Sequence, residues 1–138
     1  MVHHTLSTEL GVVVLLAVLA ASLWIPYIIG VNMHPQAEND AFVRPPALSG
    51  FPAWVHRAHR AHLNLLEQLL PFAILVLVVD RLDGYSALTW WAAVIFLGLR
   101  VTHAAGMITG TARMPLRPLI FTAGWLCCLA MAAAVFMA

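Results

Sequence analysis

Four polar side chains that could bind a charged small molecule recur along one stretch of the sequence at helical spacing. They are His56, Arg60, Asn64 and Glu67, at positions i, i+4, i+8 and i+11. On a helix that turns by about 100° per residue, this spacing confines all four side chains to an arc of about 80°. One helix face therefore carries an imidazole, a guanidinium, an amide and a carboxyl group together.

Two further polar pairs occur later in the chain. Arg100 and His103 are three residues apart and would lie side by side on a helix, and Arg113 and Arg117 are four apart in the connection that follows. In these segments and the loops beside them, one acid, Glu67, faces as many as six arginines. Such a surplus of positive charge normally calls for a bound anion.

The elements that must position these residues are membrane spans. The chain has 138 residues, of which 62% are hydrophobic and 9% charged, and its mean hydropathy of +0.89 excludes an ordinary soluble domain. Four apolar stretches each approach the ~20 residues needed to cross ~30 Å of hydrocarbon. We therefore predict an all-α fold, an integral-membrane four-helix bundle in a single domain over 1–138, with spans at approximately 6–31, 57–79, 86–108 and 115–137. The first span is expected to be retained rather than cleaved as a signal peptide.

The arginines also predict the orientation of the spans. Arg44, Arg57, Arg60, Arg113 and Arg117 lie in or beside the first and third loops, whereas the second loop holds only Arg81. By the positive-inside rule, the long loop over 32–56 and the third loop face the cytoplasm, and both termini lie on the opposite side. Because so thin a bundle shields polar groups poorly, we also expect an oligomer.

Purely structural roles for the polar residues remain open at this stage. Ionisable groups inside a span cost several kcal/mol unless they are paired or face a wet cavity. Glu67 could neutralise Arg60 or Arg100 without touching a ligand, His103 could be a packing residue, and the loop arginines could serve topology alone. The three histidines at 56, 59 and 62 fan across about 120° of the helix, too widely for one metal ion, so no metal is expected.

Two segments resemble a known family. "RAHLNLLEQLLPF" (60–72) is similar to the second-helix signature of the membrane-associated proteins in eicosanoid and glutathione metabolism, the MAPEG family. The resemblance is closest to its bacterial-type microsomal glutathione transferases, in which Leu also follows the His. "RVTHAAGMITGTARMPLRPLIFTAGWLCCLAMAAAVF" (100–136) resembles the third and fourth helices of the eicosanoid-forming members.

The resemblance implies a homotrimer that binds glutathione between neighbouring subunits. It implies a membrane-bound glutathione or related thiol transferase or peroxidase, acting in detoxification on hydrophobic electrophiles or lipid peroxides, with membrane lipid and no nucleic acid as a partner. Arg117, or alternatively Arg113, would be the catalytic residue that stabilises the thiolate. Carried over by position, the residues expected to bind glutathione are Arg57, Arg60, His62, Asn64, Glu67, Arg100 and His103.

The physics of thiols agrees with an arginine in the catalytic role. A thiol with a pKa of ~8.5 is mostly protonated at neutral pH, and a fixed guanidinium lowers that pKa because it stabilises only the anion. Arginine suits this task better than lysine, since it stays charged when it is desolvated.

Departures from the family pattern restrict which of the family's reactions we expect. The first span has no arginine near its end, Met107 and Phe121 stand where the eicosanoid-forming members have aromatic hydroxyls, and Pro118 replaces a serine. Prostaglandin or leukotriene synthesis is therefore disfavoured. Two alternatives stay open, namely a small proton-coupled exporter that uses Glu67 and a catalytically silent membrane scaffold of the same family.

Overall fold

The fold is a bundle of helices. The computed structural model describes residues 5–36 and 47–138, and every regular element in them is helical. In chain order the elements are α1 (Thr8–Ser22), α2 (Ile25–Met33), the 3₁₀ turn η1 (Leu48–Gly50), α3 (Ala53–Arg81), α4 (Ala87–Thr109) and α5 (Leu116–Met137). With α1 and α2 taken as one span, four helices are long and apolar enough to cross a membrane. The predicted all-α, four-span fold is confirmed.

The boundaries of two elements differ from the expected ranges. The first span is broken between α1 and α2, where Pro26 lies in the first turn of α2 and cannot donate a helical hydrogen bond. The expected loop over 32–56 is shorter, because α2 runs to Met33 and α3 already begins at Ala53. Arg44, which contributed to the predicted orientation, lies outside the described residues.

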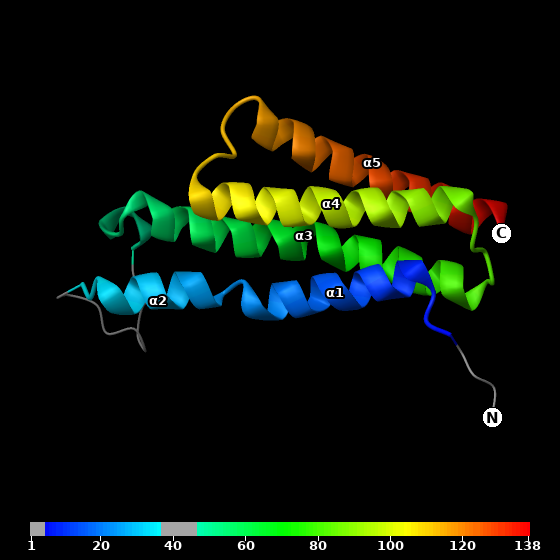
Figure 1. Cartoon of the computed structure of the whole chain (residues 1–138), viewed down its shortest axis with the longest axis horizontal. Coiled ribbons are helices and arrows are strands. Elements are labelled where there is room, and N and C mark those ends of the chain that lie inside the picture. The colour runs from blue at the N-terminus through cyan, green and yellow to red at the C-terminus, as the bar shows by residue number, and fades with distance from the viewer. Residues whose placement is uncertain (1–4, 37–46) are drawn as a thin grey trace.

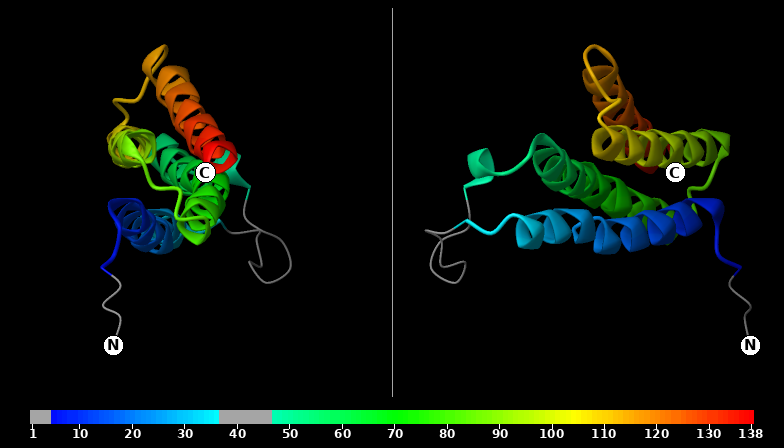
Figure 2. Two further views of the ribbon diagram at one scale, coloured as in Figure 1. Left: turned by 90° about the vertical axis from the view of Figure 1, so that its right-hand side faces the viewer. Right: turned by 60° about the vertical axis from the view of Figure 1, so that its left-hand side comes forward.

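Helix α3 is the centre of the bundle. It packs against α1, α2, α4 and α5, and α1 and α2 lie end to end along it (Figure 1). The Phe72 ring of α3 stacks on the Phe96 ring of α4, with ring centroids 3.9 Å apart. Figure 2 shows that α5 crosses the bundle obliquely, so that its first turns stand away from α3. This divergence makes room for a site between the two helices.

Both described chain ends lie at one end of the bundle, opposite the turn that joins α4 to α5 (Figure 1). At the chain-terminal end, Thr89 donates a hydrogen bond of 2.7 Å to the buried Glu9 carboxylate. Nearby, Ser7 Oγ donates to the Tyr85 hydroxyl, which in turn donates to Asp80. These contacts join α1 to the connection between α3 and α4, and they satisfy an acid that would otherwise be buried without a partner.

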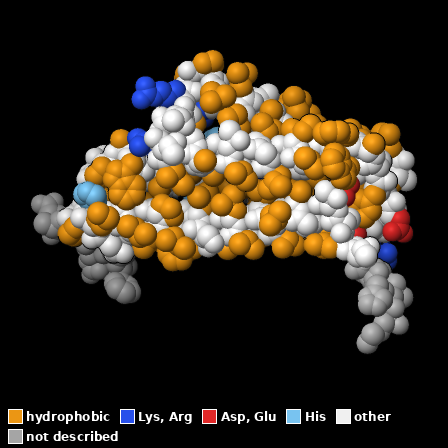
Figure 3. All heavy atoms as spheres, in the orientation of Figure 1, with side chains coloured by type: hydrophobic (Ala, Val, Ile, Leu, Met, Phe, Trp, Pro, Cys, Tyr) orange, Lys and Arg blue, Asp and Glu red, His pale blue; other side chains and the backbone are white. Residues whose placement is uncertain are grey.

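The outer surface suits a lipid environment. Hydrophobic side chains cover most of the face seen in Figure 3, and arginines protrude where α5 begins. Leucines, isoleucines and tryptophans of all four spans are exposed, among them Leu15, Leu70, Trp91 and Trp125. Exposed apolar surface on this scale identifies an integral, multi-pass membrane protein.

Candidate functional site

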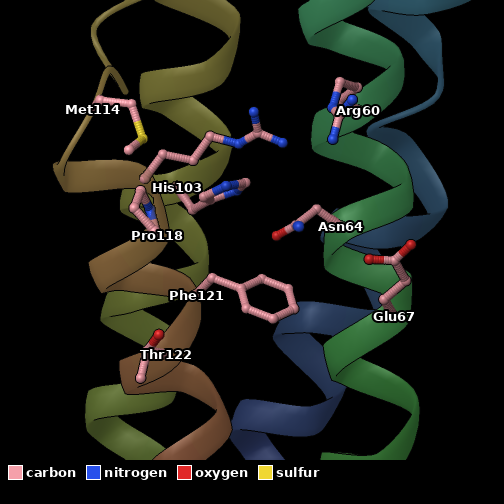
Figure 4. Close-up of a pocket in the computed structure, with 9 residues that line it drawn as sticks. Arg60, Asn64, Glu67, His103, Met114, Pro118, Phe121 and Thr122 are labelled. Carbon is pink, nitrogen blue, oxygen red and sulfur yellow. The ribbon is translucent and has the colours of Figure 1, made fainter.

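The polar face of α3 opens into a hollow of about 440 Å³. Figure 4 shows Arg60, Asn64 and Glu67 on α3 facing residues of the α4–α5 turn and of α5. We call this the polar hollow. Its lining residues are Arg60, Asn64, Glu67, His103, Met114, Arg117, Pro118, Phe121 and Thr122. Five of the residues predicted for the site, from three different helices, thus meet in one cavity.

Arg117 supplies the positive charge on the α5 side of the polar hollow. It lies in the first turn of α5, which begins directly after Pro115. Its side chain is half-buried and makes no hydrogen bond or ion pair with the rest of the described chain. Arg117 therefore has its full donor capacity available for a ligand.

Glu67 lies in the polar hollow with its carboxylate exposed. The alternative in which Glu67 neutralises Arg60 or Arg100 predicts an ion pair, and within residues 5–36 and 47–138 no such pair forms. Arg60 is likewise exposed and unpaired there. The hollow thus holds two free guanidiniums and one free carboxylate, an arrangement suited to a ligand that carries both charges.

Arg100 supports the site from behind. Its side chain is 1% exposed and donates from Nη1 to Asn64 Oδ1 at 3.3 Å and from Nη2 to the Ile120 carbonyl at 2.9 Å. Its Cζ also lies 5.5 Å from the centre of the Phe96 ring. Because the Asn64 carbonyl faces Arg100, the Asn64 amide NH₂ is left to donate into the polar hollow. Arg100 itself does not line the hollow.

The two predicted histidines are placed differently. His103 is 2% exposed and lines the polar hollow, and its Nε2 is buried without a partner among the described residues. A buried polar atom without a hydrogen bond is costly, so His103 Nε2 is a ready contact for a bound ligand. His62 also has an unpartnered Nδ1, but it does not line the polar hollow.

Arg57 and Arg113 both point to the end of α4. Arg57 Nε donates to the Met107 carbonyl at 3.0 Å, and its guanidinium packs against Gly110, whose left-handed φ of 81° ends the helix. Arg113 Nε lies 3.4 Å from the Gly110 carbonyl and is exposed. Neither residue lines the polar hollow. A cation at a helix C-terminus stabilises the helix dipole, and the structure gives Arg57 this position.

An apolar hollow of about 310 Å³ adjoins the polar hollow. The two share Glu67 and Phe121, and the apolar hollow continues between α3 and α5 along Leu75, Trp125 and Leu129. A hydrophobic molecule entering from the lipid could therefore lie directly beside a charged ligand. No group of three or more potential metal-binding side chains occurs within the described ranges.

Sequence reasoning missed two polar residues near the site, Thr122 and Gln68. Thr122 lines the polar hollow, and its spacing of four residues from Pro118 on α5 was the available signal. Gln68 is buried, donates to the Phe121 carbonyl at 2.9 Å and leaves its Oε1 without a partner in the described chain. The available signal for Gln68 was its spacing of four residues from Asn64, which continues the series of Arg60 and Asn64 along α3.

Comparison with known proteins agrees with this architecture. Residues 10–137 match the family model described as "MAPEG family". The chain is 35% identical over 78 residues to prostaglandin E synthase of Homo sapiens and, at the same identity, to that of Macaca fascicularis. The matched segment is 56% of this chain and 51% of each relative, so the chain spans about half the length of the curated relatives it matches. No solved structure matches significantly. Because the family model covers nearly the whole chain, this protein belongs to the MAPEG family.

Proposed function

We propose that this protein is a membrane-bound glutathione transferase or peroxidase that acts on hydrophobic electrophiles or lipid peroxides. The observation that carries the proposal is the polar hollow. In it, Arg60, Arg117, Asn64 and Glu67 each have side-chain donors or acceptors that make no hydrogen bond within the described residues. Glutathione has two carboxylates, one ammonium group and a thiol. The polar hollow offers guanidiniums for the two carboxylates of glutathione and a carboxylate for its ammonium group.

In this proposal each residue has a distinct task. Arg60 binds a carboxylate of glutathione, and Glu67 binds its ammonium group. The Asn64 amide, oriented by Arg100, donates to a peptide carbonyl of glutathione. Arg117 stabilises the thiolate, because its guanidinium favours only the deprotonated form. Each unit by which a guanidinium lowers the pKa of a thiol corresponds to about 1.4 kcal/mol. His103 Nε2 supplies a further polar contact.

The apolar hollow is the proposed acceptor site. Its position beside Glu67 and Phe121 places a lipid-soluble electrophile next to the thiol. In transfer, the sulfur forms a bond to carbon and displaces a leaving group. In peroxide reduction, two thiols are oxidised to one disulfide while the hydroperoxide is reduced to an alcohol and water.

Several residues favour transferase or peroxidase chemistry over the reaction named for the matched relatives. Pro118 and Phe121 line the polar hollow and carry no side-chain hydroxyl, and Met107 is buried. The similarity to bacterial-type microsomal glutathione transferases, carried by the Leu after His62, points the same way. We propose a homotrimer, with the arginine-rich end in the cytoplasm.

The test is a pair of measurements on detergent-purified protein. Millimolar glutathione should raise the melting temperature, and Arg60→Ala should weaken glutathione binding about 10- to 100-fold, the usual cost of a charged hydrogen bond. Arg117→Ala should lower kcat more than it raises Kd. Arg81→Ala is the control, because Arg81 lies at the end of α3 remote from the polar hollow. No stabilisation of the wild type by glutathione would refute the proposal.

Glu67, which is exposed and has no ion-pair partner among residues 5–36 and 47–138, also suits the alternative of a proton-coupled exporter. The two functions differ in their response to Glu67→Gln. An exporter loses proton-coupled efflux from proteoliposomes regardless of thiols. In our proposal the same variant binds glutathione less tightly, and no efflux exists to be lost.

A further inference from the structure

A second polar hollow lies against α3, and the thiol proposal assigns no task to its two histidines. It has a volume of about 300 Å³ and shares Arg60, Asn64 and Glu67 with the polar hollow. The rest of its lining comes from His56, His59 and Leu63 of α3 and from Leu48 of η1. We call it the histidine hollow.

Three neighbouring basic side chains define the histidine hollow. His56, His59 and Arg60 are spaced i, i+3 and i+4, so they are adjacent on the surface of α3. None of them forms a hydrogen bond or ion pair with another residue of the described ranges. The His59 ring also contacts the Tyr27 ring of α2, with centroids 4.6 Å apart.

The length of α3 is consistent with His56 and His59 lying at the depth of the lipid headgroups. Helix α3 has 29 residues and is therefore about 43 Å long, well beyond ~30 Å of hydrocarbon. His56 and His59 are in its first two turns, where the positive end of the helix dipole also favours an anion. Phosphate groups of lipids and soluble anions both reach this depth.

We propose that the histidine hollow binds a compact oxyanion and binds it more tightly when His56 and His59 are protonated. Histidine side chains change charge between about pH 5 and 8. The other ionisable groups that line the hollow are Arg60 and Glu67 on α3, and η1 contributes only Leu48. Outside the lining, His62 on α3 interacts electrostatically with His59, and the Tyr27 ring of α2 contacts the His59 ring. Protonation thus raises the cationic groups facing one carboxylate from one to as many as three.

The experiment uses sulfate, because its charge is constant over the pH range of interest. Sulfate is titrated by calorimetry into detergent-purified protein at pH 5.5 and 8.0, at constant ionic strength set with chloride. We expect binding to be at least about tenfold tighter at pH 5.5, because protonated His56 and His59 add charged hydrogen-bond donors for the anion. A His56→Gln/His59→Gln variant should lose this pH dependence.

Two controls make the result specific. His34→Gln removes a histidine of the α2 C-terminus that bonds the Gly30 carbonyl and does not line the hollow, so it should retain the pH dependence. The double variant leaves Arg117 and His103 intact, so any sulfate bound in the polar hollow is counted separately. Its melting temperature without sulfate should match that of the wild type.

The source of the oxyanion is distinguished in lipid nanodiscs. If a phospholipid headgroup occupies the histidine hollow, sulfate at pH 5.5 binds more weakly in phosphatidylglycerol than in phosphatidylcholine, and the double variant reduces the difference. The negative surface of phosphatidylglycerol lowers the local sulfate concentration at any site, so if the ligand is a free anion the difference between the two lipids is the same in the wild type and in the double variant. Equal sulfate affinity at both pH values, or a pH dependence that survives in the double variant, would overturn the inference. Glutathione binding is a separate titration, so failure here leaves the thiol proposal standing.

Discussion

Gly124 is the position where the smallest change should disturb the site most. This α5 glycine is buried and faces the Arg100 guanidinium and the Gln68 amide. A Cβ at Gly124 would lie 2.8 Å from Arg100 Nη2 and closer still to Gln68 Oε1. Carbon atoms do not approach polar atoms so closely, so Gly124→Ala must displace both side chains.

The cost follows from the hydrogen bonds that those side chains make. Displacing Arg100 breaks a charged hydrogen bond to the Ile120 carbonyl, which contributes about 1.5–3 kcal/mol, and displacing Gln68 breaks one to the Phe121 carbonyl, which contributes about 0.5–1.5 kcal/mol. Replacing glycine by alanine inside a helix stabilises the folded protein by about 1 kcal/mol. The net loss of stability should be about 1–3 kcal/mol. Glutathione affinity should also fall, because Arg100 orients Asn64.

Gly98→Ala is the matched control. Gly98 is in the interior of α4, and a Cβ there meets nothing within 4 Å. The assay is thermal unfolding in detergent, with and without glutathione. Gly98→Ala should melt at or above the wild-type temperature and keep its glutathione shift, whereas Gly124→Ala should melt lower and shift less. If the two variants behave alike, the close packing around Arg100 does not support the site.

Two further predictions concern residues outside the polar hollow. Arg57→Ala should destabilise the protein by about 1–2 kcal/mol, because the Met107 carbonyl loses a charged donor. The same variant should change glutathione affinity less than twofold. A tenfold loss of affinity in a binding titration would show that Arg57 does contact the ligand. Burial, aided by the hydrogen bond to Asp80, raises the pKa of Tyr85 to about 12. The folded protein thus retains a proton that the unfolded chain loses near pH 10, so stability from this group is present below pH 10 and is lost as the pH rises to about 12. Ultraviolet titration of wild type against Tyr85→Phe should show this late ionisation, and a midpoint near 10 would contradict it.

Much of the fold could be predicted from the sequence because its causes are local. The length and apolarity of the four spans, with the helical spacing of Arg60, Asn64 and Glu67, depend only on nearby residues. The predicted spans therefore fall on observed helices. The end of α2 and the start of α3 were misplaced, since polar and aromatic residues near the membrane surface suit a loop and a helix equally well.

The site itself was only partly predictable from the residue types. Seven arginines and one repeated polar spacing favour a site for a charged ligand, but they do not say which arginines face that site. That choice depends on which acceptors the packing of α3, α4 and α5 brings within reach. The structure directs Arg57 to the end of α4 and Arg100 to Asn64 and α5, and it leaves Arg60 and Arg117 in the polar hollow.

The sequence by itself determined that this chain crosses a membrane four times and carries a polar stripe into it, because hydrophobicity and helical period are properties of short segments. Only the tertiary structure decided which charges remain unpaired. A guanidinium is satisfied by whichever carbonyl or carboxylate another helix presents, and residues far apart in the chain, such as Arg57 and Met107, meet only when the bundle is assembled.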